Sequence, residues 1–557
     1  MFNGRIGHRQ EKRRLISRAA AALSLFLGFA IIVLAEATPA SATTVNVCQR
    51  GCTYTQVAPA LAAAHNGDTV LIGPGAYAGG ITIDDSVNLV GSGPGRTVIS
   101  GGGPVLTIGS STSTPTVTVS NLTITGGMSS GDPESPKCGP DIPTCGPGYT
   151  TAEALGGGIE TFPGTTVTIA HSVITGNQAV PTVTVTSVAA TCASGVMCMT
   201  SEGAGGGIDD WGTMTLIGSA VTDNQVSALQ ADGGGITVEM NASLSLQGSA
   251  VTGNSATAPS PDGRFAAGGG IFVDSGGSLA VDGSVIDDNT SRLSNLIATP
   301  YPEGGGNTDQ DNAYSGGVDV ANGSTGTIRD SEIDGNSVTV STPFGQAYGS
   351  DAALCSCGGG PLTLQDVRIE RNDLTVDALT DVANGPSGPG TLEADGNATI
   401  TDVAVVGNEM TMTSPNDNAG SIGVVGFLGG AVPVTIANSI ISDNNSTADA
   451  PNGAATIQGA GVTNDSDLVL DNVIVFGNKG VANGESGSAE GGGIWNGPIF
   501  GGPIPSLALY DSNVLGNVLS GTPAITLQGA GVYTQGAPAT LTNSLVAHNV
   551  PDQCYGC

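Results

Sequence analysis

The sequence is poor in charged side chains, in aromatic side chains and above all in basic residues. Among 557 residues, Lys and Arg number 15 against 48 Asp and Glu, only 4% are aromatic, and the net charge is −33. A surface so acidic repels nucleic acid and anionic lipid, which argues against nucleic-acid partners. The 88 glycines lack a strict Gly-X-Y period, which argues against collagen. Because 39% of residues are apolar and alternate with polar ones, disorder is also disfavoured.

Long apolar runs are scarce, and the clearest one lies near the N-terminus. It extends from Ala19 to Ala35, follows a basic region between Arg5 and Arg18, and precedes the small-residue triplet Ala40-Ser41-Ala42. This order predicts a signal peptide over residues 1–42 and a secreted, extracellular or cell-surface protein. The run is short and rich in alanine, so no membrane span is expected in the mature chain, with an uncleaved anchor as the alternative.

Cysteines are few, and they fall into close pairs. Together with export, this spacing predicts local disulfides. Zinc is the alternative, but it needs two such pairs or histidines brought together, and the histidines lie far apart in the sequence. The Cys-x-Cys pair fits a disulfide least well. The five pairs are Cys48/Cys52, Cys138/Cys145, Cys192/Cys198, Cys355/Cys357 and Cys554/Cys557.

One motif recurs through most of the chain: two or three glycines, an Ile or Val, two short strands, and then Ser-x-Ile-x-x-Asn. A β-branched aliphatic residue stands three positions before each closing Asn, and consecutive Asn residues are 30 to 47 positions apart. The closing residues are Asn177, Asn224, Asn254, Asn289, Asn336, Asn372, Asn408, Asn444, Asn478, Asn517 and Asn549. The aliphatic residues are Ile174, Val221, Val251, Ile286, Ile333, Ile369, Val405, Ile441, Val475, Val514 and Val546.

This regularity predicts an all-β fold, a single-stranded right-handed parallel β-helix of about thirteen coils. Stacked coils place equivalent residues about 4.8 Å apart, so the aliphatic column becomes a buried ladder and the Asn column a ladder of amides. A β-sandwich would not keep a three-residue offset eleven times. The variable spacing fits insertions that loop outward from a constant coil.

The two ends of the solenoid differ from the repeats. Tyr54 to Ala64 has the apolar spacing of a short amphipathic helix, which would cover the open sheet edges of the first coil. We therefore expect an N-terminal cap over residues 43–67 and the β-helix over residues 68–550. Residues 551–557 would form a C-terminal tail held by a disulfide.

The stretch GDTVLIGPGAY, followed by VNLVGSGPGRTVISG, resembles the opening coils of the pectin-lyase-like β-helix superfamily. The GGGI and Ile-x-x-Asn pair is similar to the repeats of polymorphic outer-membrane proteins and of related secreted bacterial β-helix proteins. The resemblance covers the chain from about Thr53 to the C-terminus and implies the fold. It leaves the activity open, because the superfamily contains lyases, hydrolases, esterases, epimerases and non-catalytic surface proteins.

No complete catalytic motif of that superfamily is present. Asn307-Thr308-Asp309 matches the start of the polygalacturonase pattern, but no His-Gly follows in the mature chain. No arginine lies beside an acidic cluster as in pectate lyases, and the pectin-esterase Asp-Phe-Ile-Phe-Gly motif is missing. These absences favour a non-catalytic scaffold that binds a polysaccharide or a surface protein. The alternative is a secreted polysaccharide lyase or glycoside hydrolase that uses outward carboxylates.

Acidic and aromatic residues follow the GGGI motif at positions that alternate with buried ones. Carboxylates on adjacent and alternate coils would be about 5 and 10 Å apart, which brackets the separations in carboxylate glycosidases. An acidic solvated face is the alternative. The candidate catalytic residues are Glu160, Asp209, Asp210, Glu239 and Asp274, and the candidate ligand-binding residues are Phe162, Trp211, Phe272 and Asp319.

Four long insertions precede Gly-rich strands, and we expect them to wall this candidate site along one edge. They are Met128–Ala154, Val180–Ala204, Arg292–Ser315 and Val338–Cys357. One of them contains Asn307, Asp309 and Asp311, whose alternating oxygens are typical of a calcium loop, although the sixth-position Gly and the closing Glu of such loops are missing. Calcium is the one cofactor that the sequence suggests.

Overall fold

The computed structural model describes residues 42–131, 152–182, 201–259, 265–294, 310–342, 346–358, 360–378, 390–395, 397–499 and 501–557. The predicted signal peptide up to Ser41 lies outside these residues, as do the Cys138/Cys145 and Cys192/Cys198 pairs. Within the described part, no helix has the length and apolar character needed to cross a membrane.

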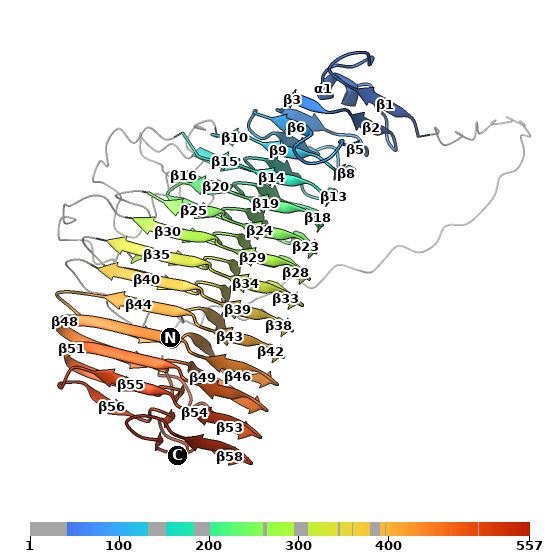
Figure 1. The fold of residues 1–557 in the computed structure, drawn as a ribbon. Coiled ribbons are helices and arrows are strands. Elements are labelled where there is room, and N and C mark those ends of the chain that lie inside the picture. Colours follow the sequence, from blue (N-terminus) through green and yellow to red (C-terminus); the bar gives the residue numbers. More distant parts are fainter. Residues whose placement is uncertain are drawn as a thin grey trace, which may run out of the picture. The chain divides into compact units, whose positions relative to one another are not determined.

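Parallel strands from successive coils build the fold, and the coils stack in sequence order (Figure 1). A typical coil contains β12 (Ile159–Thr161), β13 (Thr166–Ala170), β14 (Val173–Thr175) and β15 (Gln178–Ala179). The first two strands of each coil belong to a 27-stranded sheet, the third to a 14-stranded sheet, and the fourth to a 13-stranded sheet. The predicted right-handed parallel β-helix is confirmed, and the fourteen strands of the second sheet agree with the expected thirteen or so coils.

The aliphatic column that precedes each Asn forms the centre of the main core. In β14, Ile174 pairs in register with Ile124 of the preceding coil and with Val221 of the following one, and all three are fully buried. Each residue of this kind contributes roughly 1.5–3 kcal/mol through burial. The ladder predicted from the β-branched column is therefore present.

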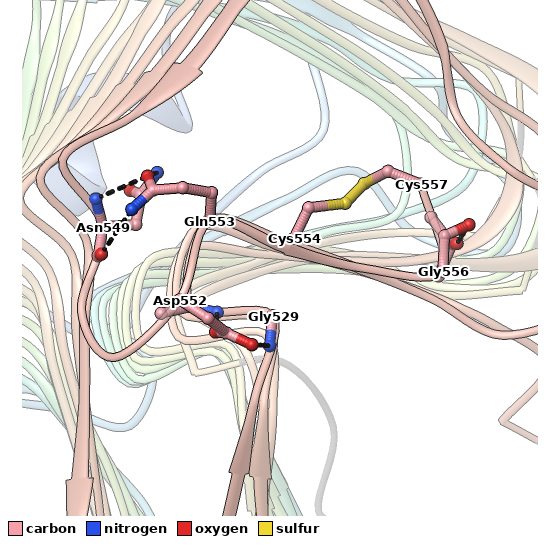
Figure 2. The surroundings of a disulfide bond; sticks show 9 residues. Gly529, Asn549, Asp552, Gln553, Cys554, Gly556 and Cys557 are labelled. Carbon is pink, nitrogen blue, oxygen red and sulfur yellow. Dashed lines mark hydrogen bonds between the residues drawn. A yellow bond between two sulfur atoms is a disulfide. The ribbon is translucent and has the colours of Figure 1, made fainter.

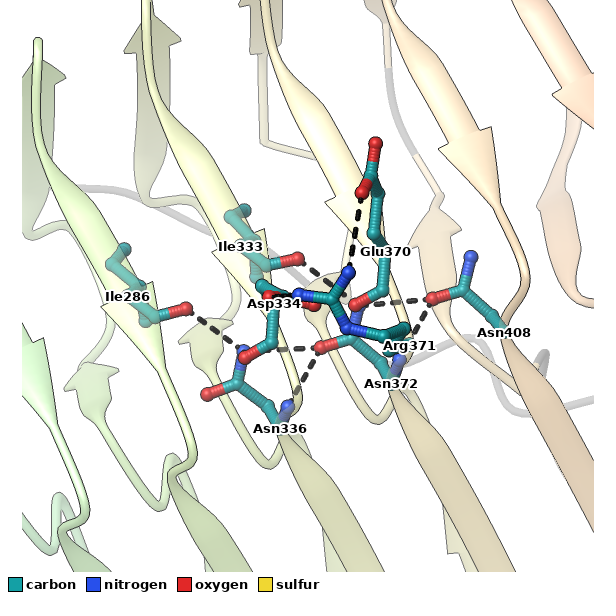
Figure 3. Close-up of polar contacts among 8 residues, drawn as sticks. All are labelled: Ile286, Ile333, Asp334, Asn336, Glu370, Arg371, Asn372 and Asn408. Carbon is teal, nitrogen blue, oxygen red and sulfur yellow. Dashed lines mark hydrogen bonds and ion pairs between the residues drawn. The ribbon is translucent and has the colours of Figure 1, made fainter.

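The Asn column is a continuous ladder of hydrogen bonds from Asn177 to Asn549. Nδ2 of Asn336 donates to Oδ1 of Asn372 at 3.0 Å and to the carbonyl of Ile286 in the preceding coil at 3.0 Å. The backbone N–H of Asn336 donates to the same Oδ1 at 2.9 Å, and Asn372 repeats the pattern toward Asn408 (Figure 3). Every amide is fully buried and fully paired, so it stabilises the turn while keeping the coils in register.

The last coil closes this ladder with side chains of its own. Gln553 takes the place of the next Asn, since its Oε1 accepts the backbone N–H of Asn549 at 2.9 Å and its Nε2 donates to the carbonyl of Asn549 at 2.9 Å (Figure 2). Asp552 accepts the backbone N–H groups of Gly529 and Ala530. The predicted tail thus contributes β60 (Cys554–Tyr555), which pairs with β57 (Val532–Thr534).

The N-terminal helix is shorter than the sequence pattern indicates. α1 covers Val57–Leu61 rather than Tyr54 to Ala64. After it the backbone forms tighter turns with hydrogen bonds between residues three apart, for example from the N–H of Ala64 to the carbonyl of Leu61. Its buried side chains face the first strands. The neighbouring β1 (Thr44–Val47) pairs in parallel with β2 (Thr69–Ile72), so the cap region also adds a strand to the large sheet.

The flanks of the predicted insertions are strands, and they enclose a second hydrophobic core. This core is rich in alanine and lies between the 13-stranded sheet and a six-stranded sheet. Because alanine is small, the two sheets approach closely there. The six-stranded sheet consists of β11 (Ala152–Leu155), β16 (Ser201–Ala204), β21 (Gln230–Asp232), β26 (Phe265–Ala267), β31 (Gln310–Tyr314) and β36 (Gln346–Ser350).

Replacing an amide of the ladder tests its contribution to stability. We expect Asn336→Ala to lower the free energy of unfolding by about 1–3 kcal/mol, because it leaves the buried N–H of Asn289 without its acceptor. Asn322→Ala is the matched control, since Asn322 is exposed in a turn. Thermal melts followed by circular dichroism measure both, and equal midpoints would contradict a stabilising ladder.

Candidate functional site

The middle residues of the strands that follow the Gly-rich turns form one column on the outer face of the 27-stranded sheet, here called the outward column. Strand register aligns them coil by coil. The strands are β12, β17 (Ile208–Asp210), β22 (Ile236–Val238), β27 (Ile271–Val273), β32 (Val318–Val320), β37 (Leu354–Ser356) and β41 (Leu392–Ala394). The residues are Glu160, Asp209, Thr237, Phe272, Asp319, Cys355 and Glu393.

Asp209 and Trp211 are tied together on this column. The indole Nε1 of Trp211 donates to Oδ2 of Asp209 at 2.8 Å, and the backbone N–H of Trp211 donates to Oγ1 of Thr161 at 2.9 Å. Asp209 is completely buried, whereas Trp211 is half-buried. The indole is therefore held in one orientation with part of its surface accessible.

Asp209 and Glu239 form a pair of neighbouring carboxyl groups that influence each other's protonation. Burial, followed by the charge of Glu239, raises the pKa of Asp209 well above its usual range. Burial likewise raises the pKa of Glu239 to about 7. Oδ1 of Asp209 is buried and has no donor among the described residues when both groups are ionised. Burial and the nearby negative charge therefore favour the protonated forms of both carboxyl groups.

Further acids surround this pair, and together they form what we call the carboxylate cluster. Glu239 feels the negative charges of Asp274 and Glu202, and the pKa of Glu202 is raised by burial and then by Glu153 and Asp274. The cluster consists of Glu160, Glu202, Asp209, Asp232, Glu239 and Asp274. Glu202 and Asp232 come from the six-stranded sheet, which therefore borders the outward column as the insertion hypothesis requires.

No basic side chain balances this cluster in the described part of the chain. The ion pairs found there join His65 to Asp68, and Arg371 to Asp334 and Glu370. The arginine pair lies beside the Asn ladder, away from the outward column (Figure 3). The cluster thus stays uncompensated except by protons or by a cation from solution.

Asp210 faces the interior of the coil, so it does not join the other candidates. It aligns with the buried Val238, and its Oδ1 accepts bonds from Oγ1 of Thr161 at 2.9 Å and from the N–H of Gly212 at 3.1 Å. Burial raises the pKa of Asp210 to about 6. The alternation that places Asp209 outward necessarily places Asp210 inward, which makes it a structural acid of the turn.

The remaining candidates are spread along the column. Phe162 and Trp211 occupy equivalent positions two residues beyond Glu160 and Asp209, and both are half-buried. Phe272 lies two coils from Asp209 on the outward column, and the next position is Asp319, whose pKa burial raises to about 7. For the predicted calcium ligands, Asn307 and Asp309 lie outside the described residues, and the backbone of Asp311 lies in β31.

Two features of the outward column were missed by the sequence analysis. Near the C-terminus, Trp495, Tyr533 and Tyr555 occupy successive positions and stack, with ring centroids 6.4 and 5.0 Å apart. In the middle, Cys355 stands in register between Asp319 and Glu393. The Gly-rich motif does precede Trp495 and Tyr533, as Gly-Gly-Gly-Ile and Gly-Ala-Gly-Val, so its spacing could have revealed the aromatic row. Before Cys355 the motif is replaced by Asp-Ala-Ala-Leu, which hides that position.

Comparisons with known proteins found no family model and no curated protein that match the chain. Among solved structures, a pectin methylesterase from Erwinia chrysanthemi is similar at 12% identity and a TM-score of 0.23, covering 66% of this chain and 80% of its own. The catalytic domain of a GH87 alpha-1,3-glucanase in complex with tetrasaccharides is similar at 13% identity and a TM-score of 0.28, covering 91% of this chain and 70% of its own. At these values the fold assignment rests on the strand pairing described above.

The buried acids make stability depend on pH, and Asp210 allows a clean test. Its proton is held more tightly in the folded chain (pKa about 6) than in the unfolded one (3.8). Its contribution to stability is therefore complete below about pH 4 and is lost as the pH rises through about 6. We expect the melting temperature to fall between pH 4.5 and 7.5. Asp210→Asn should make this fall smaller, because it removes a pH-dependent change in the free energy of unfolding of at most about 3 kcal/mol.

Asp282→Asn serves as the control for this measurement, because Asp282 is exposed on β28 (Ser278–Asp282). A series of melts at closely spaced pH values compares the three proteins. A profile for Asp210→Asn parallel to that of the unmodified chain would show that Asp210 does not titrate with folding.

Proposed function

We propose that this chain is a secreted β-helix protein that binds a polysaccharide along the outward column, centred on the carboxylate cluster and Trp211. The observation that carries the proposal is the indole of Trp211, fixed by the buried Asp209 and set among buried and half-buried acids that no described base neutralises. An aromatic ring fixed in this way offers a face for the C–H surface of a sugar. The carboxyl groups beside it can accept bonds from sugar hydroxyls.

The charge of the site indicates which polysaccharides suit it. An acidic cluster repels uronate chains unless a cation such as calcium lies between them. A neutral glycan has no such penalty, and the carboxyl group of Glu239, whose pKa burial raises to about 7, can donate a proton to a sugar oxygen. We therefore expect neutral glycans to bind without added metal, and acidic glycans to need calcium.

Hydrolysis of the bound glycan is the second candidate function, and the same carboxyl pair favours it. A carboxylic acid that titrates near pH 7 suits general acid catalysis, and Glu160 lies in register with Asp209 on the adjacent coil as a possible second carboxylate. Glu239 lies on the coil after Asp209, so Glu160 and Glu239 are two coil steps, about 10 Å, apart, nearer to the separation of carboxyls in inverting glycosidases.

Trp211→Ala tests the binding proposal. Loss of the stacking face should weaken binding to any polysaccharide retained by the unmodified chain by about tenfold, which corresponds to about 1.4 kcal/mol. Phe476→Ala is the matched control: Phe476 is also an accessible aromatic side chain, but it lies on β50 (Ile474–Phe476) in the 14-stranded sheet. Affinity electrophoresis over a panel of neutral and acidic glycans, with and without calcium, measures retention. Equal loss in both variants, or none in Trp211→Ala, would overturn the proposed site.

Product analysis on the same panel separates binding from catalysis. Release of reducing ends, or absorbance from unsaturated uronates, by the unmodified chain but not by Glu239→Gln would establish an enzyme that uses the carboxyl pair. Glycan retention without any such release establishes the scaffold function instead.

A further inference from the structure

Two successive coils, the first with β36 and β37 and the next with β41, bring two cysteines and two acids together at the outward column. One ligand atom from each of Asp351, Cys355, Cys357 and Glu393 lies within 4.8 Å of all the others. Asp351, Cys355 and Glu393 are buried, and Cys357 is half-buried with its Sγ 4.0 Å from Oδ2 of Asp351. This group is separate from the carboxylate cluster and does not depend on the proposed glycan-binding function.

Asp351 occupies a position that is glycine in most coils. In four earlier coils this position, four residues before the outward residue, is a glycine with a positive φ (Gly156, Gly205, Gly233 and Gly268), and in the directly preceding coil it is Ser315, with φ of +48°. Asp351 keeps that left-handed conformation, with φ of +60°, although a side chain makes it unfavourable. A Cβ built at Gly268 would lie 2.8 Å from Cβ of the outward Phe272, so a side chain at this position is directed against the outward residue. At Asp351 that outward residue is Cys355.

The carboxylate of Asp351 has unmet bonding capacity. The side chain is fully buried, and its Oδ1 has no hydrogen-bond partner among the described residues. Asp395 adds a further acid beside Glu393, and no described ion pair reaches the group. A buried acid in a left-handed backbone conformation, with one oxygen lacking a partner, is costly, and a cation offsets that cost.

We propose that Asp351, Cys355, Cys357 and Glu393 form a divalent metal site of the zinc class when the two cysteines are thiols. Two thiolates and two carboxylates are ligands that zinc accepts in tetrahedral geometry, with bonds of about 2.0–2.3 Å. Such bonds place adjacent ligand atoms roughly 3.3–3.8 Å apart, so modest side-chain movement closes the present arrangement around an ion. Zinc was the alternative to a disulfide for the cysteine pairs, but one pair alone supplies too few ligands. Here Asp351 and Glu393 supply the other two.

Metal binding and the disulfide exclude one another at this site. The structure holds the Cys355–Cys357 bond, whose sulfurs carry no negative charge to offer a metal. An external dithiol reduces the bond by two electrons and two protons, giving two thiols and the oxidised dithiol. Zinc then forms two metal–sulfur bonds and releases two protons to solvent. Bound zinc in turn opposes reoxidation, because the thiolates are already engaged.

Cobalt(II) is the probe, since thiolate ligation gives it a near-ultraviolet charge-transfer band and visible bands of tetrahedral geometry. The full chain is reduced anaerobically with a phosphine, titrated with Co(II), and back-titrated with Zn(II). We expect Cys355→Ser/Cys357→Ser to lose one equivalent of this signal, and Cys554→Ser/Cys557→Ser, a second local disulfide pair, to retain it. The oxidised chain should lack the signal. An identical titration for the unmodified chain and Cys355→Ser/Cys357→Ser overturns the proposal.

Asp351→Gly keeps the test independent of folding. It restores the glycine of the earlier coils, so we expect a melting temperature equal to or above that of the unmodified chain. Because it removes one of the four ligands, we also expect Co(II) affinity at this site to fall at least tenfold. Suppose that Asp351→Gly binds Co(II) with unchanged affinity while Cys355→Ser/Cys357→Ser still loses one equivalent. That result would show that Asp351 is not a ligand and would overturn the four-ligand proposal.

Discussion

Parallel pairing between successive coils is the constraint from which the rest of this structure follows. Each coil forms backbone hydrogen bonds with the next in nearly constant register, so residues at equivalent positions of the repeat become neighbours in space. Residues that share a position in the aligned repeats therefore form a line along the molecule, with neighbouring residues about 4.8 Å apart. The buried aliphatic ladder, the Asn ladder and the outward column are three such lines, and each has one kind of chemistry because each has one kind of environment.

The same constraint explains how much could be predicted from the sequence. The aliphatic and Asn columns were predictable, because burial and amide pairing demand the same residue type in every coil. The alternation beyond the GGGI motif correctly placed Glu160 and Asp209 on the outward column. It also implied that Asp210 turns inward, since neighbours on a strand face opposite sides. An acid is unexpected inside a coil, and only the structure shows that Thr161 and Gly212 bind it there.

Other features lacked a repeated signal. The strands that enclose the second core sit within segments of variable length, and their inward residues are mostly alanine, whose weak hydrophobicity gives little periodic contrast. In the Asp351 coil, Asp-Ala-Ala-Leu stands where earlier coils have Gly-Gly-Gly-Ile, so the motif that marks the outward column is lost. Cys355 was consequently considered only with its sequence neighbour Cys357. Its spatial neighbours Asp319 and Glu393 lie 36 and 38 residues away along the chain.

Gln553 and Asp552 end the ladders of the last described coil with bonds inside the chain itself. A ladder of identical steps has no intrinsic length, and an open parallel edge is a template onto which a further strand from another chain can add. Gln553 carries one methylene more than Asn, which lets its amide fold back onto Asn549 within its own coil. Asp552 occupies two N–H groups of the preceding turn. Within the last described coil, these two side chains take the place that the next Asn and the next Gly-rich turn fill in the earlier coils.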